Sequence, residues 1–383
     1  MKPTIKRAIR FAQVSVLLSA LPLSAHALQY TAVQLGTLGG TLNWVTGIND
    51  SGQVVGGSFI TGGYLHAFIS APNPTGTGQL TDLGTLGGTH STAFGINDSG
   101  QVVGYSQTTG DAAVHAFISA PNGGALTDLG TLGGTWSFAR GINDSGQVVG
   151  YSQTTGDAAT HAFISAPNGG ALTDLGTLGG TGSSAEGINN SGQVVGTSEF
   201  SDGNSSSHAF ISAPNGGALT DLGTLGGTLS IAFGINDSGQ VVGYAGTTGG
   251  NNHAFISAPN PTGTGQLTDL GTLGGQDSFA IGINNSGQVV GAAYTASNAI
   301  RHAFIYDAGT MMDLNTLLAI GLPGDNPLTQ AVAINDSGQI IAWDNDGYSY
   351  LLTPVAASVP EPAAAWLMVS ALAGLGAARW RRA

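Results

Sequence analysis

The apolar positions of this chain fall into short runs that are separated by turn residues. In residues 126–167 there are four such runs of six to eight residues, at 126–132, 136–143, 147–152 and 161–166, each bounded by Gly, Asn, Asp or Pro. Runs of this length, rich in Val, Ile, Phe and Tyr, indicate β-strands joined by tight turns. No 3.6-residue periodicity extends far enough for a helix. The pattern therefore predicts an all-β protein with four strands in this segment.

The same pattern returns about every 47 residues. The segment Gly-Ile-Asn-Asp-Ser-Gly-Gln recurs at intervals of 46 to 48 residues, with 51 for the last step, and Asn190 and Asn285 replace its Asp in two copies. Two further blocks, Asp-Leu-Gly-Thr-Leu-Gly-Gly and His-Ala-Phe-Ile, recur with it. The segment begins at Gly47, Gly95, Gly141, Gly187, Gly234 and Gly282, with a variant at Ala333.

Four strands in about 47 residues match the size of a β-propeller blade. Val148 and Val149 are adjacent and both apolar, so their strand needs a sheet on each face, which radially stacked blades supply. The body opens with a first-strand equivalent, Tyr30–Leu35, and closes with a fourth-strand equivalent, Tyr348–Pro354. We therefore expect tandem four-stranded repeats that form a seven-bladed β-propeller. The alternative is a β-solenoid, which needs a capping repeat, and the insert at 318–329 suits that role.

Both ends of the chain have the composition of sorting signals. Residues 1–27 have a basic start, an apolar run and a small-residue pattern at Ala25 and Ala27, which predicts a signal peptide cleaved after Ala27. Residues 355–383 contain Pro360-Glu361-Pro362, an apolar stretch that we expect to be a transmembrane helix, and a basic cluster at the chain end. The arginines of that cluster are Arg379, Arg381 and Arg382.

This tail resembles the PEP-CTERM sorting signal, because all three of its parts are present in order. The resemblance implies recognition by an exosortase-like membrane peptidase, anchoring in the inner membrane before processing, and an association with exopolysaccharide and biofilm matrices. The body, residues 28–354, is similar to the HAF family of probable extracellular repeats. That family implies export and repetition and no particular reaction. The expected location is the cell surface or the extracellular space.

Charge and cysteine content exclude several classes of function. The chain has a formal net charge of −13 and no cysteine, and Arg140 and Arg301 are the only basic residues between positions 28 and 358. Nucleic-acid binding needs cationic patches, so we exclude it. Disulfides, Cys-zinc sites and thiol nucleophiles are excluded as well.

The repeated polar blocks favour structural roles over chemistry. Asn-Asp-Ser-Gly is typical of a strand-connecting turn, although its oxygens leave calcium as an alternative. Equivalent histidines in successive repeats stand about 10 Å apart, too far to share a zinc ion away from a ring centre, so we expect hydrogen-bonded histidines. Ser, His and Asp occur in every repeat without a nucleophile elbow. We predict no catalytic residue, no metal site, no cofactor and no enzyme.

The residue just before each Gly-Ile-Asn differs from copy to copy and could mark a ligand surface. With nearby aromatic residues, these positions would lie at one height around a ring, where aromatic rings could stack on sugars. The expected function is a structural or adhesive role at the cell surface, with a glycan-binding propeller as the alternative and a surface hydrolase as a third interpretation. The candidate ligand-binding residues are Trp44, Phe94, Trp136, Phe138, Arg140 and Phe233.

Overall fold

The computed structural model describes residues 28–200, 206–296 and 300–355, and these residues are mostly in β-strands. They belong to one compact unit, Gln29–Ala356. No α-helix occurs in this described part of the chain, so the prediction of an all-β body is confirmed. The 3-10 helices are Thr109–Asp111 (η1), Thr155–Asp157 (η2), Leu314–Leu317 (η3) and Pro323–Asp325 (η4).

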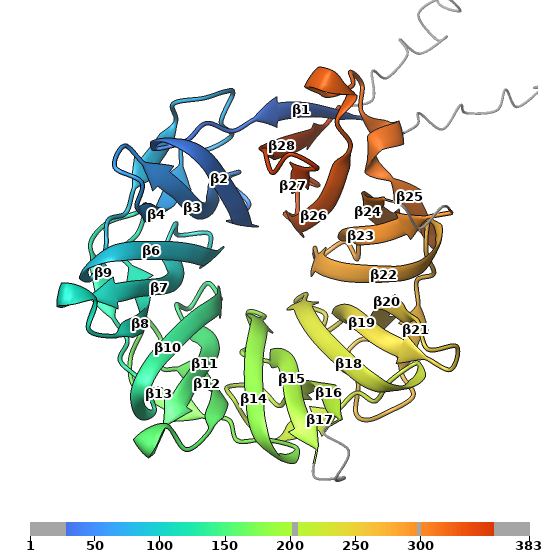
Figure 1. Cartoon of the computed structure of the whole chain (residues 1–383). Helices are drawn as coiled ribbons and strands as arrows, with labels where there is room; N and C mark the ends of the chain where they lie inside the picture. The colour runs from blue at the N-terminus through green and yellow to red at the C-terminus, as the bar shows by residue number, and fades with distance from the viewer. Residues whose placement is uncertain (1–27, 201–205, 297–299, 356–383) are drawn as a thin grey trace, which may run out of the picture. The chain divides into compact units, whose positions relative to one another are not determined.

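The strands fall into four positions, from the centre of the ring outward (Figure 1). The innermost strands are β2 (Gly39–Ile48), β6 (Gly87–Ile96), β10 (Gly133–Ile142), β14 (Gly179–Ile188), β18 (Gly226–Ile235), β22 (Gly274–Ile283) and β26 (Leu328–Ile334). The second strands are β3 (Val54–Ile60), β7 (Val102–Thr108), β11 (Val148–Thr154), β15 (Val194–Phe200), β19 (Val241–Thr247), β23 (Val289–Thr295) and β27 (Ile340–Asp344).

The two outer positions hold shorter strands. The third strands are β4 (Leu65–Ser70), β8 (Val114–Ser119), β12 (Thr160–Ser165), β16 (Ser207–Ser212), β20 (Asn252–Ser257), β24 (Arg301–Asp307) and β28 (Ser349–Pro354). The outermost strands are β5 (Leu80–Asp82), β9 (Leu126–Asp128), β13 (Leu172–Asp174), β17 (Leu219–Asp221), β21 (Leu267–Asp269), β25 (Thr310–Asp313) and β1 (Tyr30–Gln34).

These strands form a β-propeller with four-stranded antiparallel blades, as the sequence predicted. Counted by strand pairing, however, five four-stranded sheets stand separately, not seven. The strands β6–β9 and β10–β13 share one eight-stranded sheet, because a single parallel bridge between Val114 and Trp136 joins β8 to β10. The alternative of an open solenoid is wrong, because the first strand pairs with the last.

The ring is closed by a strand that comes from the opposite end of the chain. The run at 126–132 is predicted to be the first strand of its repeat, but the strand observed there is shorter, β9 (Leu126–Asp128), and pairs with β8 of the preceding repeat. Each blade is therefore offset by one strand from the sequence repeat. The first copy, β1, has no preceding repeat and pairs antiparallel with β28, from Tyr30 opposite Pro354 to Gln34 opposite Tyr350. This pairing covers the sheet edges that an open array would leave exposed.

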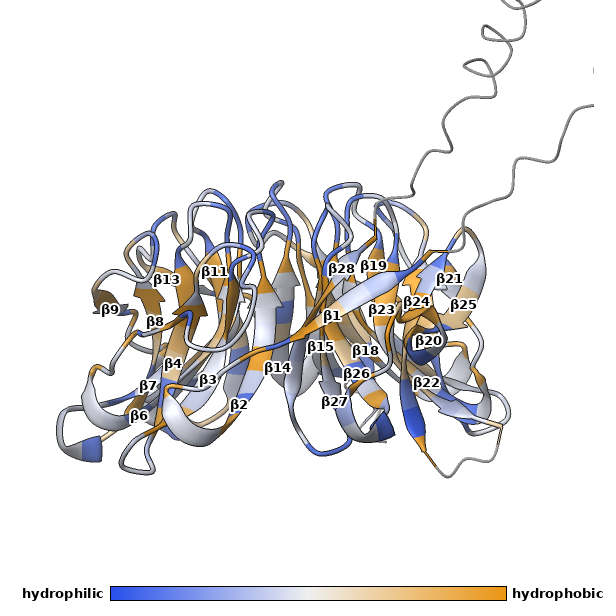
Figure 2. Ribbon diagram, turned by 90° about the horizontal axis from the view of Figure 1, so that it is seen from above, coloured by the Kyte–Doolittle hydropathy of each residue, from blue (hydrophilic) through white to orange (hydrophobic). Residues whose placement is uncertain are grey.

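The core lies between neighbouring blades. Val148 and Val149 are both fully buried, and they pack in two different clusters on the two faces of β11. Val148 contacts the cluster shared with β7 and β8, whereas Val149 contacts the cluster that includes Phe210 of β16. Apolar residues are accordingly concentrated in the strands (Figure 2). The expectation that strands are buried on both faces is confirmed.

Two glycines that the sequence placed inside strands have different roles. A Cβ atom on Gly150 would lie 1.9 Å from the carbonyl oxygen of Phe138, so β10 and β11 can approach only because Gly150 has no side chain. Gly130 instead has open space around it and a φ of 68°. It serves a turn after β9 and does not mediate a close approach.

No helix in the described residues is long and apolar enough to cross a membrane. The predicted transmembrane helix of the tail lies outside the described residues, as does the predicted signal peptide.

Candidate functional site

The Asn of every Gly-Ile-Asn copy belongs to a closed ring of hydrogen bonds at the centre of the propeller. Each side-chain Nδ2 donates to the backbone carbonyl oxygen of the next Asn at 3.0–3.2 Å, and the last Asn donates to the first. Each residue is only 3–4% exposed. The members of this Asn ring are Asn49, Asn97, Asn143, Asn189, Asn236, Asn284 and Asn335.

Each ring Asn also holds the turn that follows it. Asn143 accepts hydrogen bonds on Oδ1 from the Ser145 hydroxyl at 2.8 Å and from the Gln147 backbone N–H at 2.9 Å. Its Nδ2 donates a second bond to Oε1 of Gln147 at 2.9 Å. Gly146 completes the turn with a φ of 75°. The turn interpretation of Asn-Asp-Ser-Gly is therefore confirmed, and the repeated residues serve contacts within and between blades.

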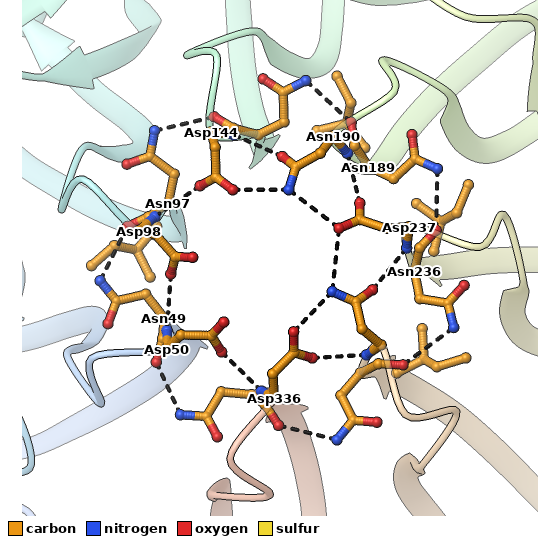
Figure 3. Close-up of a pocket in the computed structure, with 18 of the residues that line it drawn as sticks. Asn49, Asp50, Asn97, Asp98, Asp144, Asn189, Asn190, Asn236, Asp237 and Asp336 are labelled. Atoms are coloured by element: carbon orange, nitrogen blue, oxygen red, sulfur yellow. Dashed lines mark hydrogen bonds between the residues drawn. The ribbon is translucent and has the colours of Figure 1, made fainter.

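The residue that follows the Asn in each copy belongs to a second ring, which we call the mouth ring. It surrounds a central cavity of about 180 Å³. Each backbone N–H in this mouth ring donates to a side-chain Oδ1 of the following copy at 2.8–3.1 Å. Figure 3 shows both rings and the hydrogen bonds that close them. The mouth ring consists of Asp50, Asp98, Asp144, Asn190, Asp237, Asn285 and Asp336.

The mouth ring is chemically uneven. Asn190 donates to Asp144 at 2.8 Å and to Asp237 at 3.3 Å, and Asn285 bridges Asp237 and Asp336 in the same way. Between Asp336 and Asp144 the ring continues through Asp50 and Asp98, where no amide intervenes. This arc therefore concentrates negative charge without side-chain amide donors between its carboxylates, although Asp50 and Asp98 each accept a backbone N–H.

Asp50 lies in the middle of that arc. Burial raises the pKa of its carboxyl above 3.8, and the neighbouring Asp98 and Asp336 carboxylates raise it further, against the lowering effect of the Asp336 N–H. Among residues 28–200, 206–296 and 300–355, no group of three or more His, Cys, Asp or Glu side chains is arranged to hold a metal ion. What the geometry provides is a narrow anionic opening.

The histidines of the His-Ala-Phe blocks hydrogen-bond on the outer part of the blades. In each copy Nδ1 lies 2.6–3.0 Å from the Asp carboxylate of the Asp-Leu-Gly block. The pair joins the third strand to the outermost strand, and Oδ1 of Asp128 also accepts the Gly130 N–H at 2.7 Å. A hydrogen-bonded histidine was predicted, but its Asp partner was missed. The joint recurrence of the two blocks was the available signal. The pairs are His66–Asp82, His115–Asp128, His161–Asp174, His208–Asp221, His253–Asp269 and His302–Asp313.

The variable residue before each Gly-Ile-Asn is the extra residue of a β-bulge. In β10 the register shifts between Ala139 and Gly141, so Arg140 is unpaired by the ladder, and the other inner strands shift at the same position. Bulges redirect side chains. The Arg140 guanidinium lies 4.2 Å from the centre of the Phe94 ring, and its Nε lies 3.5 Å from Glu186. Three successive variable positions therefore contact one another.

Arg140 is the centre of this contact chain. Its Nη2 donates to the Tyr151 hydroxyl at 3.1 Å. Burial raises the pKa of Glu186, while the Arg140 charge and a hydrogen bond from Ser184 lower it. The Arg140 guanidinium therefore has partners within the chain, and the Glu186 carboxylate balances its charge.

Four of the six predicted ligand-binding residues lie in one cluster. Trp136 and Phe138 contact edge to face with ring centres 5.4 Å apart, and Phe94 joins them through Tyr105, whose ring lies 4.8 Å from Phe138. Arg140 joins the cluster through Phe94 and Tyr151. Tyr105 and Tyr151 were missed, although both follow Val-Val-Gly in their repeats. The other two predicted residues lie in different blades, where Trp44 contacts Phe59 and Phe233 contacts Tyr244.

The residues predicted for sorting lie outside the described part of the chain. They are the cleavage-site residues Ala25 and Ala27 and the tail residues Pro360, Glu361, Pro362, Arg379, Arg381 and Arg382.

Comparison with known proteins identifies the fold alone. No family model matches the chain, and no curated protein matches it. Among solved structures it is similar to the β-propeller domain of the Trilobed protease from Pyrococcus furiosus, with a TM-score of 0.54, 8% identity, and 84% of this chain and 98% of that chain covered. It is also similar to a structure from a study of two prolyl endopeptidases, with a TM-score of 0.52, 10% identity, and 87% of this chain and 51% of that chain covered.

Proposed function

We propose that this chain is an exported cell-surface or matrix-associated protein whose propeller has a structural or adhesive role. In this proposal residues 1–27 direct export, and the tail at 355–383 holds the chain in the inner membrane. An exosortase-like peptidase then cuts near Pro360-Glu361-Pro362, which leaves the propeller on the cell surface or in an exopolysaccharide matrix. The mature propeller is not an enzyme.

The observation that carries the proposal is how the repeated residues are used. The Asn ring joins neighbouring blades, and the His–Asp pairs hold the outermost strands. The polar residues that are common to the repeats therefore stabilise the fold. A catalytic site would need a constellation that differs from its copies and is shielded from water.

We also propose that the propeller has seven blades, with the eight-stranded sheet counted as two. The single parallel bridge between Val114 and Trp136 is the contact that merges them, and the two halves have the same four-strand order as the separate sheets. The Asn ring supports this count, because its seven members need one blade each.

Processing of the tail tests the export proposal. The full chain, with an epitope tag inserted within residues 201–205, would be expressed in a Gram-negative host that has an exosortase. We expect the mature protein to begin at Leu28 and to leave the inner membrane. The variant Glu361→Ala should stay in the membrane fraction with its tail attached. An untouched N-terminus and a cytoplasmic product would contradict the proposal.

A second candidate function is glycan binding by the cluster around Trp136. The favourable observation is that Trp136, Phe138 and Tyr151 are only half-buried and contact one another, so apolar ring faces remain near the surface. Aromatic faces with partial negative charge suit the C–H groups of a sugar ring. Binding on a glycan array that Trp136→Ala abolishes would favour this function, and an array without binding would count against it.

A further inference from the structure

The closure seam, where β1 and β28 meet β2, contains a cavity that is different in character from the central one. Its volume is about 340 Å³, within the usual range for small-ligand pockets, whereas the central cavity holds about 180 Å³. Residues from distant parts of the chain line it. They are Gln34, Leu35, Gly36, Thr37, Gly40, Thr41, Leu42, Asn43, Thr77, Gly78, Tyr348 and Ser349.

One buried polar group in this cavity lacks a partner. Asn43 is 4% exposed, and its Nδ2 donates to the backbone oxygens of Leu35 and Gly36, but its Oδ1 is buried and accepts no hydrogen bond. A buried acceptor without a donor costs folding free energy. A ligand that brings a hydroxyl or N–H group to this oxygen would recover that energy.

The comparison with the other blades shows that Asn43 departs from the repeat. Five other inner strands have Ser at this position, and Ser137 for example donates to Gly130 O and accepts the Ala116 N–H of the preceding blade. That exchange satisfies the hydroxyl completely. At the seam the neighbouring strand is β28, which begins at Ser349. The Ser349 hydroxyl donates to the backbone oxygen of Asn43 and not to its side chain. Asn43 lines the cavity, and its buried side-chain oxygen is left without a donor.

The rest of the lining determines what chemistry the cavity would accept. None of the described residues that line it carries a charge. Amide and hydroxyl groups of Gln34, Thr41 and Thr77 are donors and acceptors, Leu35 and Leu42 are apolar, and the Tyr348 ring at the rim is 44% exposed. The body is acidic, so an anion is repelled, and without a carboxylate at the cavity a cation has no counter-charge.

We propose that the closure seam binds a neutral sugar residue. A pyranose has an apolar face for Tyr348 and the leucines, and it has hydroxyl donors for Asn43 Oδ1. Among uncharged ligands this combination of one apolar face and several hydroxyls fits the lining best. The proposal has the same ligand class as the second candidate function, glycan binding at Trp136. It depends on different residues, so the two can be tested separately.

Saturation-transfer NMR on the purified full-length chain tests the proposal. The probes are D-glucose, D-galactose and N-acetyl-D-glucosamine, with D-glucuronate as the anionic comparison. We expect transfer to at least one neutral sugar and none to glucuronate. Asn43→Ser, which restores the residue found at this position in other blades, should keep the fold and weaken binding about tenfold.

Two variants in identical loops provide the matched control. The segment Pro-Thr-Gly-Thr-Gly-Gln occurs at 74–79 and again at 261–266, so Thr77 and Thr264 are equivalent and both exposed. Thr77→Phe should fill the cavity and abolish transfer, while Thr264→Phe should leave it unchanged. Transfer to no neutral sugar, or transfer that persists in Thr77→Phe, would overturn the proposal. Transfer that Trp136→Ala abolishes would assign the sugar to the aromatic cluster instead and would also overturn it.

Discussion

Asn143 in the Asn ring and Asn43 at the closure seam are the same residue type at the same burial, yet their surroundings differ. Both are 4% exposed. Asn143 uses both ends of its amide, with bonds to Asn189, Gln147 and Ser145. Asn43 uses one end and leaves Oδ1 without a donor. The difference teaches that repetition satisfies buried polar groups, because each copy supplies the partner that its neighbour needs.

The seam occurs once, so no repeated partner exists there. The chain replaces the usual His and Ala with Tyr348 and Ser349, and it closes the ring with β1 in place of a strand that follows in sequence. These departures leave space and an unpaired acceptor. The residues common to the repeats therefore support the fold, whereas the buried polar atoms without a partner lie at positions that depart from the repeat, in regular blades as well as at the seam.

The largest effect in this comparison should come from weakening the closing strand. Tyr30 on β1 is 1% exposed, and burial raises the pKa of its hydroxyl to about 12. Tyr30→Ala removes this buried ring and should lower the free energy of unfolding by about 3–5 kcal/mol. Urea denaturation followed by circular dichroism measures the change. Tyr64→Ala, at a residue that is 47% exposed, is the control and should stay within about 0.5 kcal/mol of wild type.

The Asn ring should respond uniformly to substitution. Asn143→Ala leaves the Gln147 N–H without its partner and removes one of the two donors to the Asn189 carbonyl, so we expect a loss of about 2–3 kcal/mol. Asn189→Ala should give the same loss within about 0.5 kcal/mol, because the two positions have equivalent contacts. The same denaturation assay applies. A neutral Asn143→Ala would show that the ring does not stabilise the fold.

The sequence predicted the strands, the repeats and the propeller because these follow from local patterns. Val148 and Val149 alone indicated burial on two faces, and turn residues marked the strand ends. The offset of each blade by one strand could not be derived, because the pattern of β9 is the same whether it pairs with β8 or β10. Only the tertiary contacts choose between the two pairings.

The candidate sites were less accessible from sequence. The Asn ring depends on the bond from Asn335 to the Asn49 carbonyl, 286 positions away, which no local pattern encodes. The aromatic cluster was found in part, since Trp136 and Phe138 stood out as aromatic residues near the variable positions, whereas Tyr105 was not among the residues predicted. The seam cavity was missed entirely, although Asn43 could have been noticed where five copies have Ser.

Removing the charge of an aspartate in the mouth ring should change the free energy of unfolding in opposite directions at Asp50 and at Asp237. Asp50→Asn should raise the free energy of unfolding by about 0.3–0.5 kcal/mol after solvent screening, because it removes a charge that burial and then repulsion within the arc disfavour. Asp237→Asn should lower it by a similar amount, because Asp237 accepts from both Asn190 and Asn285. Thermal unfolding at low and high salt measures both, and both effects should shrink as salt rises.

The effect at Asp50 should also depend on pH. The folded-state pKa of Asp50 lies above 3.8, so the folded chain holds this proton more tightly than the unfolded chain does. Wild type therefore recovers stability at this site as pH falls through the folded pKa toward 3.8. The advantage of Asp50→Asn should be full at neutral pH and absent below pH 3.8. An advantage that persists in acid would show that the charge of Asp50 is not its cause.

The smallest effect should come from the His–Asp pairs, because they are partly exposed. His115 and Asp128 have side chains that are 22% and 43% exposed, and their closest atoms are 2.8 Å apart. A double-mutant cycle with His115→Ala and Asp128→Ala should give a coupling energy of about 0.2 kcal/mol, at the low end for exposed pairs. The equivalent pair His161–Asp174 has nearly the same exposure and distance, so its coupling should agree within error. A coupling of several kcal/mol at one pair and none at the other would mean that the copies are not equivalent. In that case a repeated pair could have a role of its own, and the separation of a uniform scaffold from a single irregular seam would fail.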